Sequence, residues 1–144
     1  MRAIRMYICM RIAYTWRSGV MPVLLNHLIV PATDRRASAA FLADLLGLPG
    51  PGADTGPFTP VRINHDLTFD FDDRRGATPG HYAFLVDDAT FDGVLARLRR
   101  AREIAFGSGT ANGWDREVNH LGGGRGVYVR DPDGHSYELF TAVP

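Results

Sequence analysis

The sequence contains no lysine, and all sixteen of its basic residues are arginine. Its one cysteine, Cys9, leaves no partner for a disulfide within the chain, which favours a reducing, cytoplasmic location. It also lacks an apolar run long enough to cross a bilayer. Sixteen acidic residues balance the arginines, so the formal net charge is zero. We therefore expect neither a nucleic acid nor a membrane surface as a partner.

The length of 144 residues and the 45% hydrophobic content fit one globular domain with a single core. The first twenty residues differ from the rest, because they carry four arginines and no acid. Arginines interrupt every apolar stretch there, so the segment does not have the pattern of a secretory signal. We expect residues 1–21 to be an extension with no part in the chemistry, and residues 22–144 to form a single domain.

The two halves of this domain repeat one order of elements. Each half predicts an apolar strand that contains a histidine, then a helix with an aspartate at its start, then antiparallel strands. The predicted strands are 24–30, 58–63, 67–71, 81–86, 104–107, 127–130 and 136–142. The long Gly-rich segment 108–126 is predicted to be a loop, in which Trp114 either covers a cleft or packs the loop down. This order favours an α+β fold with helices on one face of each sheet.

In three predicted strands, side-chain alternation places one ionisable residue on the face away from the helices. In LLNHLIV, HYAFLV and SYELF these residues are His27, His81 and Glu138. Two imidazoles and a carboxylate that converge in a cleft would suit a divalent metal and leave coordination positions open. The same positions also fit partly exposed histidines and a solvated glutamate, so the spacing alone leaves both interpretations open.

Three segments resemble the vicinal oxygen chelate superfamily, which includes glyoxalase I, extradiol dioxygenases, fosfomycin resistance enzymes and bleomycin resistance proteins. They are LNHLIVPATD with FLADLLG, HYAFLV with the helix after it, and GRGVYVRDPDGHSYELF. The resemblance covers roughly residues 22–142. It implies two βαβββ modules, about 22–75 and about 80–144, that form a cupped mixed sheet around a cleft, with the helices on the outer face.

The resemblance also implies a metal centre with His27, His81 and Glu138 as ligands. Glyoxalase I-like members have a fourth protein ligand, for which Asp70 is the nearest match, although its side chain is shorter than the usual one. Without a fourth ligand the set is a 2-His-1-carboxylate triad, which suits non-haem Fe2+ and oxygen chemistry. We therefore expect a divalent metal ion, with Fe2+ favoured and Zn2+, Ni2+ or Mn2+ as alternatives.

The expected activity is that of a small metal-dependent enzyme, extradiol dioxygenase-like or glyoxalase-like. Its substrate would be a small molecule that chelates the metal through neighbouring oxygens. Glu138 and His120 are candidates for moving a proton, and Tyr128 for hydrogen-bonding a substrate oxygen. A solvated His120 and a Tyr128 that anchors the core are the alternatives. The family implies a homodimer, and the alternative function is a non-catalytic ligand- or drug-binding protein of the bleomycin resistance type.

Overall fold

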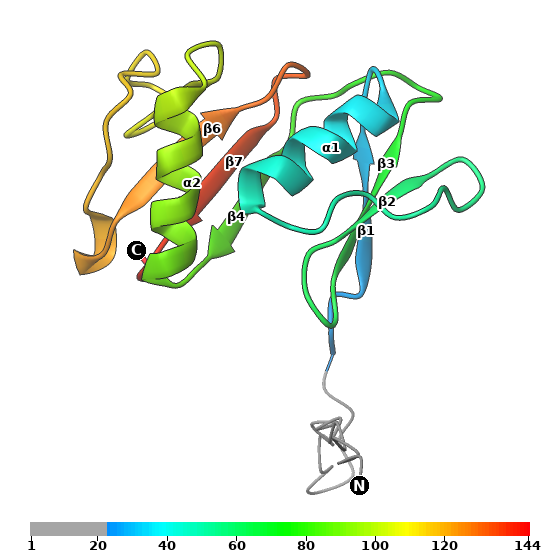
Figure 1. The fold of residues 1–144 in the computed structure, drawn as a ribbon, viewed down its shortest axis with the longest axis horizontal. Helices are drawn as coiled ribbons and strands as arrows, with labels where there is room; N and C mark the ends of the chain where they lie inside the picture. Colours follow the sequence, from blue (N-terminus) through cyan, green and yellow to red (C-terminus); the bar gives the residue numbers. More distant parts are fainter. Residues whose placement is uncertain (1–22) are drawn as a thin grey trace, which may run out of the picture.

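The computed structural model describes residues 23–144, and the prediction for residues 1–21 lies outside this part of the chain. Figure 1 shows two groups of strands, each with one helix packed against it. The elements are β1 (His27–Pro31), α1 (Arg35–Leu46), β2 (Thr59–Arg62), β3 (Thr68–Asp72), β4 (His81–Leu85), α2 (Asp88–Arg100), β5 (Ala105–Gly107), the 3-10 turn Leu121–Gly123, β6 (Gly126–Arg130) and β7 (Ser136–Phe140).

The strands form two mixed sheets, which confirms the predicted α+β class. The first sheet has the order β1-β3-β2, and the second has the order β4-β7-β6-β5. In each sheet the strand before the helix pairs in parallel with the last strand of its own module, while the other pairs are antiparallel. The order of elements repeats between the halves, as the sequence predicts.

The first module has one strand fewer than a full βαβββ unit. Residues 49–57 (PGPGADTGP) take the place of the strand that β5 supplies in the second module. Three prolines in this segment lack the N–H that a ladder needs. The segment forms one isolated β-bridge, between Thr55 and Phe58, and no ladder.

Local capping explains where both helices begin. The Asp34 side chain accepts hydrogen bonds from the backbone N–H groups of Arg36 and Ala37. In α2 the cap is Asp87, the first of the two adjacent aspartates Asp87 and Asp88, and it accepts a hydrogen bond from the backbone N–H of Thr90. Adjacent aspartates offer the same side chain to the cap, so the pattern alone could not separate them.

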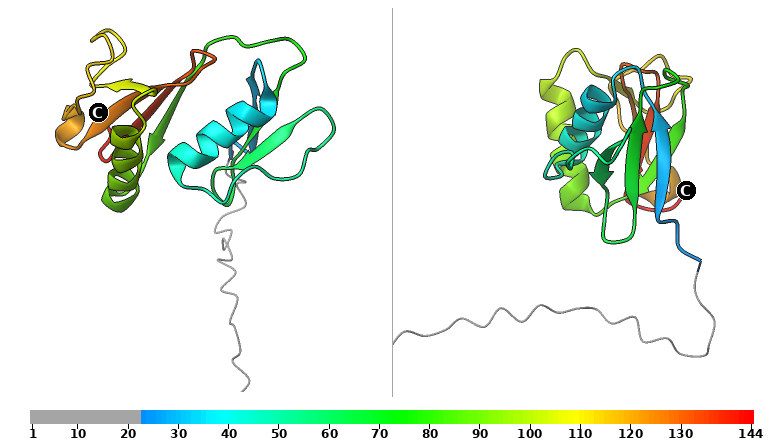
Figure 2. Two further views of the ribbon diagram at one scale, coloured as in Figure 1. Left: turned by 45° about the horizontal axis from the view of Figure 1, so that its top comes forward. Right: turned by 90° about the vertical axis from the view of Figure 1, so that its right-hand side faces the viewer.

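The two modules share one hydrophobic core between the helices and the sheets. Phe69 of β3 lies 5.3 Å from Tyr82 and 5.7 Å from Phe84 of β4, measured between ring centres. Both helices cover the same side of the strands in Figure 2, so the opposite side of each sheet is open. There Ile29 is 53% exposed and Leu85 is 60% exposed. In residues 23–144 no helix combines the length and apolar character needed to cross a membrane.

Candidate metal centre

The parallel pairing of β4 with β7 brings two of the three predicted ligands together. Ala83 is the register partner of Glu138, so His81 lies one pleat away on the same open face. His81 Nε2 is 2.9 Å from Glu138 Oε2. The Glu138 side chain is 12% exposed, whereas that of His81 is 53% exposed. A largely buried carboxylate requires a partner, and here the His81 imidazole supplies one.

Tyr128 lies on the same face, opposite Glu138 in the pairing of β6 with β7. Its ring meets that of His81 edge-on, with 5.9 Å between centres. Burial, the hydrogen bond with Glu138 and the charge of that carboxylate together raise the pKa of Tyr128 to about 12. The phenol is therefore protonated at neutral pH and can donate a hydrogen bond. The sequence could not assign its face, because the turn between β6 and β7 hides the register.

His27 occupies the open face of the first sheet, and one chain does not bring it to His81 and Glu138. It is exposed, and its Nδ1 is 3.1 Å from Asn26 Oδ1. Within residues 23–144, a single group of three or more possible ligands has its atoms within 4.8 Å of one another, and that group contains none of the three predicted ligands. Asp70 is the register partner of Ile29 and lies on the same open face as His27.

The predicted catalytic residue His120 lies in the exposed loop before β6. Its Nδ1 is 3.1 Å from the carbonyl oxygen of Gly124, so it contacts the backbone of its own loop. The structure places Tyr128 beside the His81–Glu138 pair and gives His120 no such neighbour among its hydrogen bonds.

The group of possible ligands is Asp131, Asp133 and His135, in the DPDGH turn. It does not fit a metal, because both ring nitrogens of His135 are already used. Nδ1 accepts the N–H of Gly80 at 2.9 Å, and Nε2 donates to the carbonyl of Pro31 at 2.8 Å. Burial also raises the pKa of Asp131, which disfavours the anionic form that a metal needs. The turn instead joins the start of β4 to the end of β1, a role that the sequence did not reveal.

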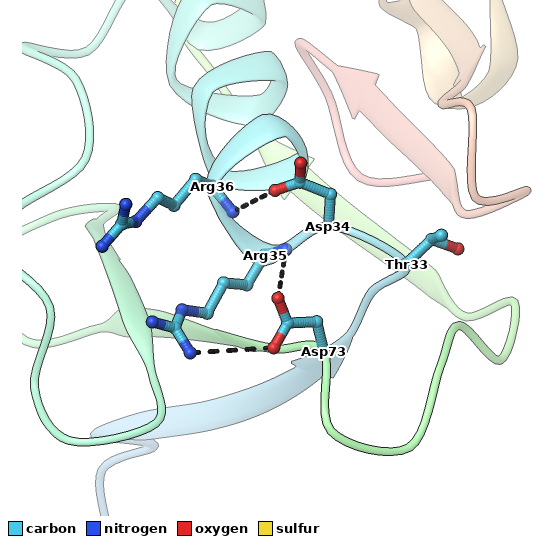
Figure 3. Close-up of a pocket in the computed structure, with 5 residues that line it drawn as sticks. All are labelled: Thr33, Asp34, Arg35, Arg36 and Asp73. Atoms are coloured by element: carbon cyan, nitrogen blue, oxygen red, sulfur yellow. Dashed lines mark hydrogen bonds and ion pairs between the residues drawn. The ribbon is translucent and has the colours of Figure 1, made fainter.

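A hollow of about 450 Å³ lies at the start of α1, lined by Thr33, Asp34, Arg35, Arg36 and Asp73. Figure 3 shows Asp73 bonded to Arg35 and Asp34 bonded to the backbone N–H of Arg36. Asp73 accepts from the backbone of Arg35 and pairs with its guanidinium at 3.7 Å. Asp34 is occupied by the helix cap. The guanidinium groups of Arg35 and Arg36 also pair with Asp54, so surface ion pairs make up most of this hollow.

Solved structures identify the relatives of this chain. The structure named oxidase ChaP-H1 is 48% identical, with a TM-score of 0.75, over 85% of this chain and 98% of that one. Oxidase ChaP-H2 is 45% identical, with a TM-score of 0.78, over 86% of this chain and 96% of that one. A lactoylglutathione lyase from Agrobacterium tumefaciens is 23% identical, with a TM-score of 0.59, over 85% and 95%, and shares the fold.

The chain is related to these two oxidases and has the fold of the vicinal oxygen chelate superfamily. This confirms the resemblance found in the sequence. No family model matches the chain, and the comparison with curated proteins gives no match. Within the superfamily fold, the open face of the second sheet carries His81, Tyr128 and Glu138 in adjacent rows.

Proposed function

We propose that this vicinal oxygen chelate protein is a metal-dependent dioxygenase. Its substrate would be a small molecule that binds the metal through two neighbouring oxygens, such as a catechol. The observation that carries the proposal is the close pair of His81 Nε2 and Glu138 Oε2, 2.9 Å apart on an open sheet face. The sequence identity of 48% and 45% to two proteins named as oxidases favours oxygen chemistry over the glyoxalase-like alternative.

The donor groups fit the proposed metal. An imidazole nitrogen and a carboxylate oxygen lie 2.9 Å apart, and His27 is an exposed imidazole that a second copy could supply as the third ligand. This set suits Fe2+, with Zn2+, Ni2+ and Mn2+ as alternatives. Ferrous iron bound there would supply Lewis acidity and a position for oxygen beside the chelated substrate.

The residues of the chain supply orientation and proton handling. Tyr128, with a pKa raised to about 12 by burial and by Glu138, serves as a hydrogen-bond donor to a substrate oxygen and not as a base. Glu138 is the candidate proton acceptor on this face, since it is already within hydrogen-bond distance of His81. His120 contacts the carbonyl oxygen of Gly124 in its own loop, so we do not assign it the proton transfer.

The reaction balances without an external reductant. One molecule of catechol and one of O2 combine into one ring-opened product that contains every atom of both, and a carbon–carbon bond next to the diol is broken. The substrate supplies all four electrons that reduce O2, and both oxygen atoms enter the product. This property separates the proposal from oxidase reactions that release hydrogen peroxide, because no peroxide would accumulate.

The first test is elemental analysis of protein purified without chelator or nickel affinity, together with oxygen uptake on catechol. We expect about one equivalent of iron per chain, lost in Glu138→Ala and His81→Ala. His65→Ala is the matched control, because its side chain is 90% exposed and pairs with Asp66 in a turn. Zinc or nickel would favour the glyoxalase-like alternative. No metal after reconstitution would refute the enzyme and leave a ligand-binding protein.

We also propose that the protein is a homodimer in which the site is shared. His27 and Ile29 on one open face, and His81 and Leu85 on the other, leave imidazoles and large apolar side chains exposed together. A second copy would cover these apolar groups and bring its own His27 towards His81 and Glu138.

Mixing two inactive variants tests this arrangement. His27→Ala and His81→Ala each remove a ligand, and exchange between them forms hybrid dimers. If the site is shared, one of the two sites in each hybrid has every ligand, and about a quarter of wild-type activity returns. If each site lies within one chain, no hybrid site is complete and the mixture stays inactive. Light scattering reports the oligomeric state independently.

A further inference from the structure

The segment that follows β5 packs against Gly107, on the sheet face that carries Tyr128 and Glu138. Gly107 ends β5 and is the register partner of Tyr128, which in turn is opposite Glu138. A Cβ on Gly107 would therefore point to the open face. It would lie 2.6 Å from Asp115 Oδ1, 2.8 Å from Asp115 N and 3.0 Å from Trp114 Cα. The loop thus sits against this row of the sheet.

The distance between Gly107 and Glu138 would suit a small substrate held between the loop and the carboxylate. Neighbouring strands are about 4.8 Å apart, and Gly107 is two strands from Glu138, so about 10 Å separate them across the sheet. Gly107 carries no side chain to fill that space, and Tyr128 stands between the two. In Figure 1 the segment after β5 runs along the outer edge of the second sheet.

The backbone at Trp114 is held in an unfavourable conformation. Trp114 has a φ of 58° and Arg116 a φ of 63°, and they are the positive-φ residues other than glycine in the described part of the chain. This left-handed region is costly for a side chain with a Cβ, and such strain persists only where neighbouring contacts impose it.

Two anchors impose the strain. Asp115 accepts hydrogen bonds from the backbone N–H groups of Ser108 and Glu117 and from the Ser108 hydroxyl, at 2.8, 3.0 and 2.6 Å. Arg116 donates to the carbonyl oxygens of Leu98 and Ile104.

The Arg116 guanidinium also lies 4.4 Å from the centre of the Phe106 ring. Trp114 itself is only half-buried and is not part of the hydrophobic core of residues 23–144. The contacts of Asp115 and Arg116 therefore fix the backbone at Trp114, although the Trp114 side chain does not pack in the hydrophobic core.

We propose that the Trp114 indole forms one wall of the substrate site and stacks on a planar aromatic substrate. This inference rests on the proposed dioxygenase function and assigns Trp114 a role in binding its aromatic substrate. A loop needed merely to cover the free edge of β5 would not require an aromatic side chain at a strained position.

Fluorescence tests the contact without turnover. The chain has two tryptophans, Trp16 and Trp114, so in Trp16→Phe the emission comes from Trp114 alone. Acrylamide quenching is measured on the Fe2+-loaded full chain without oxygen, with and without saturating catechol. Calorimetry in the same buffer establishes that catechol is bound. We expect the quenching constant to fall by about half or more, because a stacked ring shields the indole.

Steady-state kinetics supply the second readout. In Trp114→Ala we expect the KM for catechol to rise about three- to tenfold, the range for an aromatic contact, while kcat changes much less. Trp114→Phe should restore most of the wild-type KM, and Trp16→Phe is the matched control. Thermal melting of each variant shows whether the fold is retained.

The outcomes separate the two proposals. If catechol binds but neither the quenching constant nor the KM of Trp114→Ala changes, the inference about Trp114 is wrong and the dioxygenase proposal stands. If catechol neither binds nor drives oxygen uptake in the metal-loaded protein, the dioxygenase proposal fails and the inference about Trp114 falls with it. If kcat and the melting temperature of Trp114→Ala both fall while KM is unchanged, Trp114 has a purely structural role in the loop and the inference is wrong.

Discussion

His135 offers the sharpest test of how the two modules are joined. Its ring is fully buried and connects Gly80, before β4, to Pro31, at the end of β1. We predict that His135→Ala destabilises the protein strongly without removing any metal. The fully occupied ring nitrogens carry this prediction, because a ligand would need one of them free.

The magnitude follows from three losses. Removing the ring leaves the Gly80 N–H and the Pro31 carbonyl without partners, at about 1–3 kcal/mol each when buried. Both residues are half-buried, so water relieves part of this cost and about 1 kcal/mol each is appropriate. Lost packing against Tyr82 and Tyr137, whose ring centres lie 5.6 and 6.3 Å away, adds about 1–2 kcal/mol. The expected loss is about 3 kcal/mol.

Urea unfolding followed by fluorescence measures this loss, with metal content determined on the folded variant. His65→Ala, on the surface, should change the free energy of unfolding by less than about 0.5 kcal/mol. A loss below about 1 kcal/mol in His135→Ala would refute the bridging role. If a chelator destabilised the wild type as much as the substitution does, and had no effect on the variant, the turn would be a metal site after all.

Further predictions concern single groups. Hydrogen bonds from the Arg74 guanidinium lower the pKa of Asp72 from 3.8 to about 2. The stabilisation from this carboxylate is therefore present above about pH 4 and lost as the pH falls towards 2. Acid unfolding of Asp72→Asn should show a weaker pH dependence in this window. In metal-free protein, Glu138→Gln should lower the pKa of Tyr128 from about 12 towards, but not to, 10, because burial remains; ultraviolet titration in alkali measures this, and an unchanged value would contradict the contact. Gly107→Ala should cost about 1–3 kcal/mol in thermal or urea unfolding, since the new Cβ meets the loop backbone at Asp115; a neutral substitution would show that the loop is not seated there.

The sequence alone determined the local features of this fold. Asp34 and Gly47 mark the ends of α1 because a cap needs a short polar side chain and a left-handed C-terminal residue needs glycine. Strand alternation put His81 and Glu138 on faces away from the helices, and the α+β class was confirmed. These features depend on neighbours in the sequence, which is why they could be predicted.

The tertiary structure decided which of these side chains meet. His81 and Glu138 are 57 positions apart, and they are in contact only because β4 pairs in parallel with β7 in one register. The same strand order leaves His27 on a separate sheet and commits both nitrogens of His135 to the junction between modules. Pairing between distant strands depends on the shared core and on loop closure, neither of which is encoded in the local periodicity of a strand.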